Sequence, residues 1–173
     1  TSYTYDNMDR RVSRKDPLGR TEGFQYDADG NVTQFTDRKG QVTTFAYDGL
    51  NRKTLAGFGT QPGPTYQRSI AYSYDAGNRL TQAVDSVSGT ITHAFDGLNR
   101  LTSETTPQGS VSYAYDAAGR RTSFTVTGQA AANYSYDNDN RLTGITQGGS
   151  TTGFSYDNAS RRALRSLCPM AWW

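Results

Sequence analysis

An aromatic residue followed by Asp recurs eight times along this chain at a nearly constant interval, and this recurrence limits the possible folds. Six of the seven intervals are 20 or 21 residues, and the remaining one, between Tyr47 and Tyr74, is 27 residues. A period near 20 residues predicts a repeat architecture in which each copy buries its apolar surface against its neighbours. The pairs begin at Tyr5, Tyr26, Tyr47, Tyr74, Phe95, Tyr115, Tyr136 and Tyr156.

Each copy has the pattern aromatic-x-Tyr-Asp-x-x-(Gly/Asn)-Arg-x-Thr, with variations. The stretch 111–115 alternates large and small residues, as expected of a β-strand that presents apolar side chains on one face. His93 replaces the first aromatic residue in one copy. The pattern therefore predicts a strand that ends at the Tyr-Asp pair, with a ladder of aromatic residues on one face.

The residues after the Asp predict a tight turn. Three positions later stands Gly or Asn in six copies, which are the residues that best tolerate positive φ. The short Asp carboxylate is able to accept hydrogen bonds from N–H groups of its own turn. An Arg follows in seven copies, and we expect it to pair with an Asp of the adjacent repeat. We assign this structural role in the turn to Asp27, Asp48, Asp75, Asp96, Asp116, Asp137 and Asp157.

A second turn with Gly follows about ten residues later, so each repeat has two short strands. The predicted fold is an all-β antiparallel strip of about sixteen strands, twisted, curled and open-ended. The strip covers 1–165, with an insertion near 57–66, and 166–173 form a tail outside the repeat. Its open strand edges are expected to pair with further repeats or with another chain.

The composition excludes several classes of protein. Fifteen Arg and fourteen Asp are interspersed and the net charge is +2, so no basic block is present to follow a nucleic acid. No apolar run approaches the ~20 residues of a membrane span. The single Cys168 excludes an internal disulfide, and no motif predicts a cofactor or a metal.

The units 74–81 and 115–120 resemble the YD repeat of the Rhs family, which also builds teneurins and the shell subunits of insecticidal toxin complexes. The resemblance covers residues 3 to about 162. It implies a strip of β-hairpins that spirals into a hollow shell, and a secreted or cell-surface location. Eight repeats are far fewer than a closed shell uses, so we expect the chain to be part of a larger protein.

Three functions follow from these features. The first is a structural or interaction module of a toxin-delivery or extracellular protein. The second is a carbohydrate-binding module, in which aromatic faces stack on sugar rings. The third is a hydrolase of glycans or related polymers that uses Asp and Tyr in a cleft, although no catalytic motif supports an enzyme. The residues predicted for ligand binding are Tyr74, Tyr115, Tyr136, Arg79, Arg120 and Arg141.

Overall fold

The computed structural model describes residues 1–59 and 66–167, and all regular structure in these ranges is β-strand. This confirms the all-β prediction with two strands in each repeat. The strands are β1 (Ser2–Tyr5), β2 (Arg11–Lys15), β3 (Thr21–Tyr26), β4 (Val32–Thr36), β5 (Val42–Tyr47), β6 (Lys53–Gly59), β7 (Arg68–Tyr74), β8 (Leu80–Asp85), β9 (Gly89–Phe95), β10 (Leu101–Thr106), β11 (Gly109–Tyr115), β12 (Arg121–Val126), β13 (Ala132–Tyr136), β14 (Leu142–Gln147), β15 (Ser150–Tyr156) and β16 (Arg162–Leu167).

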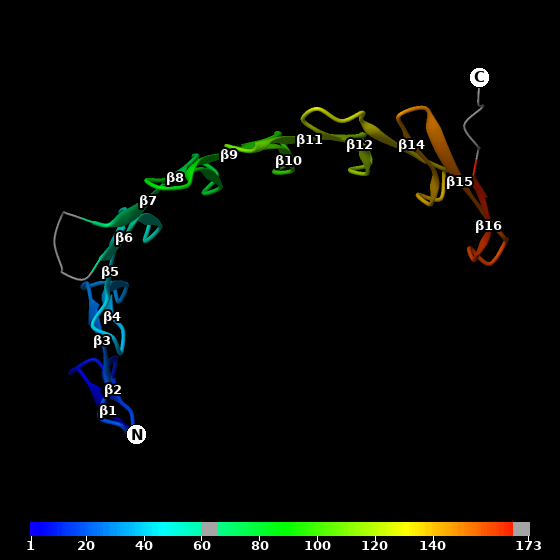
Figure 1. Ribbon diagram of the computed structural model, residues 1–173. Helices are drawn as coiled ribbons and strands as arrows, with labels where there is room; N and C mark the ends of the chain where they lie inside the picture. The colour runs from blue at the N-terminus through cyan, green and yellow to red at the C-terminus, as the bar shows by residue number, and fades with distance from the viewer. Residues whose placement is uncertain (60–65, 168–173) are drawn as a thin grey trace. The chain divides into compact units, whose positions relative to one another are not determined.

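The strands lie in the sheet in the order in which they occur in the chain, from β1 to β16 (Figure 1). Neighbouring strands run antiparallel, as short connections such as those between β1, β2, β3 and β4 require. Strands β1 and β16 are therefore the two ends of the strand order. The residues divide into two compact units, Thr1–Ile91 and Thr92–Trp173, with the division inside β9.

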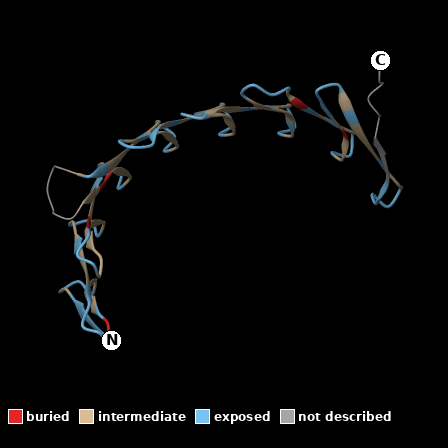
Figure 2. Ribbon diagram, in the orientation of Figure 1, coloured by how far each residue is buried: buried red, intermediate tan, exposed pale blue. Residues whose placement is uncertain are grey.

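Each unit is a single layer of sheet in which few residues are buried and most strand residues are intermediate in exposure (Figure 2). Among the described residues, the buried apolar side chains are Val42, Ala56 and Ala132, and no large side chain is fully buried. Directly opposed aromatic residues provide cross-strand contacts instead. The rings of Phe24 and Phe35 lie 5.1 Å apart in one of these pairs.

The turns after the Tyr-Asp pairs have the predicted geometry. The residue three positions after each Asp has positive φ, for example 59° at Asn51 and 82° at Gly119. The register of every hairpin shifts by one residue next to this turn, as at Tyr47. Such a shift is a β-bulge, and it increases the local twist and re-aims the Tyr side chain.

Two of the predicted regions lie partly outside the described residues. The insertion predicted near 57–66 begins inside β6, and residues 60–65 lie outside the described residues. Gly57 lies against the ring of Tyr66, where any larger side chain would overlap the ring. At the other end β16 continues to Leu167, and residues 168–173 of the predicted tail lie outside the described residues.

Candidate functional site

The carboxylate of the Asp that recurs in each repeat organises the turn that follows it. Oδ1 of Asp48 accepts hydrogen bonds from the backbone N–H groups of Leu50 (2.9 Å) and Arg52 (3.0 Å). Its Oδ2 accepts a hydrogen bond from Nε of Arg52 at 2.8 Å. We call this five-residue unit, from the Asp to the Arg, the Asp turn. The same three contacts recur in the Asp turns that begin at Asp6, Asp75, Asp96, Asp116, Asp137 and Asp157.

These contacts explain the preference for Asp over Glu, because the longer side chain of Glu would not place both oxygens on these donors. They also favour the ionised form. The hydrogen bond from the Arg52 side chain, followed by those from backbone N–H groups, lowers the pKa of Asp48 below its ordinary value. In the turn at Asp137, the backbone N–H of Arg141 is the main cause of the lowered pKa.

The Arg of each Asp turn also contacts the next repeat. Nη1 of Arg120 donates to the backbone oxygen of Asp137 at 3.1 Å and to Oδ1 of Asn140 at 2.9 Å. Its guanidinium lies 4.8 Å from the ring centre of Tyr136, a cation–π distance. Equivalent stacking joins Arg10 to Tyr26, Arg52 to Tyr74, Arg100 to Tyr115 and Arg141 to Tyr156.

The Tyr hydroxyl makes a second contact with the preceding repeat. The hydroxyl of Tyr136 donates to the backbone oxygen of Arg121, the residue that follows the Arg of the preceding turn, at 2.8 Å. We call this combination of a stacked Arg and a bonded Tyr hydroxyl the Tyr–Arg joint. The same hydroxyl bond, at 2.8–3.0 Å, is made by Tyr26, Tyr47, Tyr74, Tyr115 and Tyr156.

The predicted partner of the Arg was wrong for the pairs that the structure describes. We expected an ion pair with an Asp of the adjacent repeat, but Arg120 pairs with Asp116 of its own turn at 2.7 Å. The adjacent repeat offers a backbone oxygen and a side-chain amide oxygen instead. The cause is the tight turn, which brings residues four positions apart into direct contact.

The second joint differs from the others because Asn31 replaces the Arg. The Asn31 amide donates to Oδ2 of Asp27 at 3.0 Å and to Oδ1 of Asn51 at 2.8 Å. It therefore reproduces two of the polar contacts of the Arg, to the Asp of its own turn and to the Asn of the next turn, but is too short to stack on Tyr47. Burial, and secondarily the charge of Asp27, raise the pKa of the Tyr47 hydroxyl.

The opposite edge of the first unit contains two Asp turns that the sequence analysis did not separate from ordinary glycine turns. Asp16 and Asp37 accept the same backbone hydrogen bonds, from Leu18 and Arg20 and from Lys39 and Gln41. The spacing from Asp16 to Gly19 and Arg20 matches the repeated motif and was the available signal. Ion pairs form a charged cluster at this edge, which consists of Arg14, Asp16, Arg20, Glu22 and Arg38.

The side chains predicted for ligand binding already have partners within the repeats. The hydroxyl groups of Tyr74, Tyr115 and Tyr136 are bonded to backbone oxygens, and an Arg covers one face of each ring. Arg79 and Arg141 hold the Asp of their own turns at 2.7 Å, as does Arg120. Ligand binding would have to use the faces of the Tyr rings that the Arg does not cover. This part of the prediction stays a prediction.

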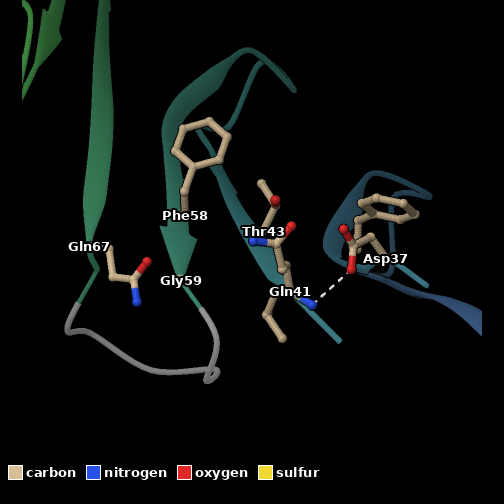
Figure 3. A pocket seen from close by; sticks show the side chains of 8 residues that line it. Asp37, Gln41, Thr43, Phe58, Gly59 and Gln67 are labelled. Carbon is tan, nitrogen blue, oxygen red and sulfur yellow. Dashed lines mark hydrogen bonds between the residues drawn. The ribbon is translucent and has the colours of Figure 1, made fainter. Parts of the chain in front are cut away.

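Two shallow hollows lie elsewhere in the structure. One, of about 180 Å³, is lined by Asp37, Gln41, Phe58 and neighbouring residues, and Oδ1 of Asp37 accepts the backbone N–H of Gln41 at 2.8 Å (Figure 3). The other, of about 240 Å³, includes Glu104, whose carboxylate lies 3.1 Å from Nε2 of His93.

Within residues 1–59 and 66–167, no three His, Cys, Asp or Glu side chains gather as metal ligands. No helix in the same ranges is long and apolar enough to cross a membrane. The side-chain contacts that recur from repeat to repeat are those of the Asp turns and the Tyr–Arg joints.

Comparisons with known proteins match this description. The family model for the RHS repeat matches residues 26–57 and 95–132. None of the curated proteins compared with the chain is similar enough to count as a match. Among solved structures, a crystal structure of TcdB2-TccC3 is 15% identical with a TM-score of 0.67, and the match covers 97% of this chain and 11% of that one. A structure of the Photorhabdus luminescens Tc holotoxin pore is 16% identical with a TM-score of 0.62, over 95% of this chain and 10% of that one.

The chain thus spans about a tenth of the length of the solved structures that it matches. At these identities the likeness establishes the fold. The family model extends the likeness to the sequence over two stretches of the chain, and both stretches contain Asp turns. The RHS-repeat model therefore describes two stretches of this chain, residues 26–57 and 95–132, within a fold that the chain shares with the Tc toxin structures.

Proposed function

We propose that this chain is a wall segment of a β-shell in a larger toxin-delivery protein of the RHS type. The observation that carries the proposal is that the Asp, Arg and Tyr of the motif bond to one another from repeat to repeat. Arg120, for example, contacts Asp116 in its own turn and Tyr136 in the next one. We therefore infer that the contacts of the motif join consecutive repeats into one sheet and fix the register between them.

The comparisons support this role at the level of architecture. The matched structures are titled as TcdB2-TccC3 complexes and as a Tc holotoxin pore, and nearly all of this chain aligns with about a tenth of each. A segment of this size is a part of a wall and not a whole enclosure. The secreted or cell-surface location and the carbohydrate-binding alternative rest on the family resemblance.

The proposal is tested by exchanging the aligned segment of the chain titled TcdB2-TccC3 for this array. A wall segment should keep the complex assembled, as judged by co-purification and electron microscopy, because the ends of each repeat offer the same strand edges. A chimera that loses the complex, although the array itself is folded by circular dichroism, would contradict the proposal.

A glycan array separates the proposal from the alternative. We expect no selective binding by the purified chain, because the Tyr hydroxyls serve the joints. Saturable binding of one class of glycan, abolished by Tyr115→Ala but kept by an exposed control such as Leu50→Ala, would replace the wall segment with a carbohydrate-binding module. The control is suitable because Leu50 is 66% exposed at the tip of its turn.

A further inference from the structure

The Asp turn that begins at Asp37 differs from the other Asp turns of the described residues in one contact. In the nine others, the side chain four positions after the Asp donates a hydrogen bond to Oδ2 at 2.6–3.0 Å, and this side chain is Arg in eight turns and Asn31 in the ninth. The corresponding residue here is Gln41, whose backbone N–H bonds to Oδ1 of Asp37 at 2.8 Å. Among residues 1–59 and 66–167, no side chain donates to Oδ2 of Asp37.

This carboxylate lines the hollow shown in Figure 3, together with two half-buried Phe side chains. Phe35 on β4 lies opposite Thr43 on β5, and Thr43 lies opposite Phe58 on β6. The two Phe side chains therefore project from the same face of the sheet, with their Cα atoms two strand spacings, roughly 10 Å, apart. The floor of the hollow between them is Thr43, and Asp37 follows at the end of β4.

A carboxylate beside an aromatic ring is the combination that binds Arg in the internal joints. Arg10 donates to Oδ2 of Asp6 at 2.7 Å, and its guanidinium lies 4.7 Å from the ring centre of Tyr26. In the hollow, the carboxylate and the rings are both present. No Arg or Lys of the described part of the chain stacks on Phe35 or Phe58.

Two cationic side chains that are near the hollow in sequence are bonded to other carboxylates. Arg38 donates to Glu22 at 2.6 Å, and Arg68 donates to Asp85 at 3.0 Å. The residues that line the hollow include no cation. Its volume is about 180 Å³, and a cavity of about 150 Å³ accommodates benzene, a planar molecule of similar size to a guanidinium group.

We propose that the hollow at Asp37 binds the arginine side chain of a partner polypeptide. The guanidinium donates to Oδ2 of Asp37 and lies between the rings of Phe35 and Phe58. An arginine within a polypeptide is favoured over the free amino acid, since no cationic side chain lines the hollow to bind a free α-carboxylate. The inference goes beyond the wall segment, because it assigns a binding site that does not depend on what the repeats enclose.

A nuclear magnetic resonance titration of the full chain tests the site with tripeptides that differ in the central residue. Acetyl-Gly-Arg-Gly-amide should shift the signals of the Thr43 backbone amide and the Gln67 side-chain amide, with a Kd of about 10 mM or lower at constant ionic strength. The lysine tripeptide should bind at least about threefold more weakly, because it lacks the planar group. The citrulline tripeptide, which is planar but uncharged, should bind about tenfold more weakly, and free L-arginine should also bind more weakly.

Two substitutions test the role of the carboxylate. Asp37→Asn keeps one oxygen for the backbone N–H groups of the turn and should weaken binding of the arginine tripeptide about tenfold. Asp29→Asn, which removes a charge at an exposed position of another turn, is its control and should leave the Kd unchanged.

Gln41→Arg supplies the residue found in eight other turns. Its guanidinium should pair with Oδ2 of Asp37, raise the melting temperature by about 1–3 °C and prevent binding of the tripeptide. Gln41→Met, a control of similar length without charge, should keep the Kd within about threefold. This pair keeps the test decisive if Asp37→Asn does not fold by circular dichroism.

The other outcomes overturn the inference. An absence of shifts up to about 50 mM shows that the hollow does not bind arginine. Equal binding of the lysine or citrulline tripeptide shows attraction to charge alone or to a planar group alone, and equal binding of free arginine removes the partner polypeptide. Full binding by Gln41→Arg places the tripeptide elsewhere on the chain. A loss of binding in Asp29→Asn or Gln41→Met shows that the carboxylate of Asp37 is not the group that selects arginine.

Discussion

At the scale of single residues, the Tyr hydroxyl and the Tyr ring have separate contacts within the joint. The hydroxyl of Tyr136 bonds to the backbone oxygen of Arg121, and the ring lies under Arg120. Tyr134, two positions earlier, is a matched comparison, because its hydroxyl lies 3.5 Å from Arg121 and its ring is also covered by that Arg. The two hydroxyls thus differ mainly in the quality of their hydrogen bonds.

Replacing Tyr136 with Phe should therefore lower the free energy of unfolding by about 0.5–1.5 kcal/mol, the usual net value of one hydrogen bond. Tyr134→Phe should change it much less, because a bond at 3.5 Å is marginal. Urea unfolding followed by circular dichroism measures both. Equal effects of the two substitutions would show that the hydroxyl of Tyr136 contributes nothing specific.

Asn31 allows the opposite experiment. Replacing it with Arg restores the residue found in the other joints and adds stacking on Tyr47, so the melting temperature should rise by about 1–3 °C. Asn31→Lys is the control, because it adds the charge without the planar group that donates to two neighbours. A rise of the same size in both variants would assign the effect to charge alone.

The Asp turns predict how stability depends on pH. The folded-state pKa values of Asp6, Asp48, Asp116 and Asp157 are lowered, so these groups stabilise the folded chain above their unfolded-state pKa near 4. Stability should be nearly constant from about pH 8 to about pH 5 and should fall progressively below about pH 4.

Urea unfolding at a series of pH values measures this curve. Asp48→Asn should be less stable than the wild type at neutral pH and should show a smaller loss on acidification, because one coupled carboxylate is missing. An unchanged acid slope in this variant would show that the contacts of Asp48 do not contribute to stability.

At the scale of elements, the hairpins were predictable and the contacts between them were not. The alternation in 111–115 and the residue at positive φ, such as Asn51, predict the strands and the turns from local chemistry. The joint depends on which residues of two hairpins meet, and the β-bulge beside each Tyr decides this. The Arg of each turn is visible in the sequence as a repeated residue. Its partners in the next repeat, an aromatic ring and a backbone oxygen, are not visible there.

The connection between β6 and β7 gives a test at this scale. Gly57 lies on β6 under the ring of Tyr66, so Gly57→Ala should displace that ring and lower the melting temperature by several degrees. Gly49→Ala is the control, because nothing lies within 4 Å of its position and its φ is not positive. The double variant Gly57→Ala, Tyr66→Ala should recover part of the loss, and failure to recover would point to the backbone of β6 instead.

At the scale of the whole molecule, the repeats are coupled mainly to their neighbours. Within each unit the sheet is one layer, and a strand contacts the strands before and after it. Stability should then be close to a sum of repeat and neighbour terms. The repeat in the sequence predicted the order of the strands. It did not predict that no large side chain among the described residues is fully buried.

Hydrogen exchange followed by mass spectrometry tests this coupling. Arg120→Ala removes one joint in the second unit, so protection should fall most in β11–β14 and less with each further repeat. Lys39→Ala, at an exposed turn, is the control. A uniform loss of protection in all strands that follow the substitution would indicate cooperative unfolding in place of nearest-neighbour coupling.

The single layer also has a thermodynamic consequence. Heat capacity increases on unfolding because apolar groups become hydrated, by about 12–15 cal/mol/K per residue in compact domains. Here Val42, Ala56 and Ala132 are the buried apolar side chains among the described residues, and most of the others are only partly covered, so some of their surface is hydrated before unfolding. The increase per residue should be smaller, so the free energy of unfolding should vary with temperature along an unusually flat curve. Such an array would respond to cooling less than a compact domain of equal length.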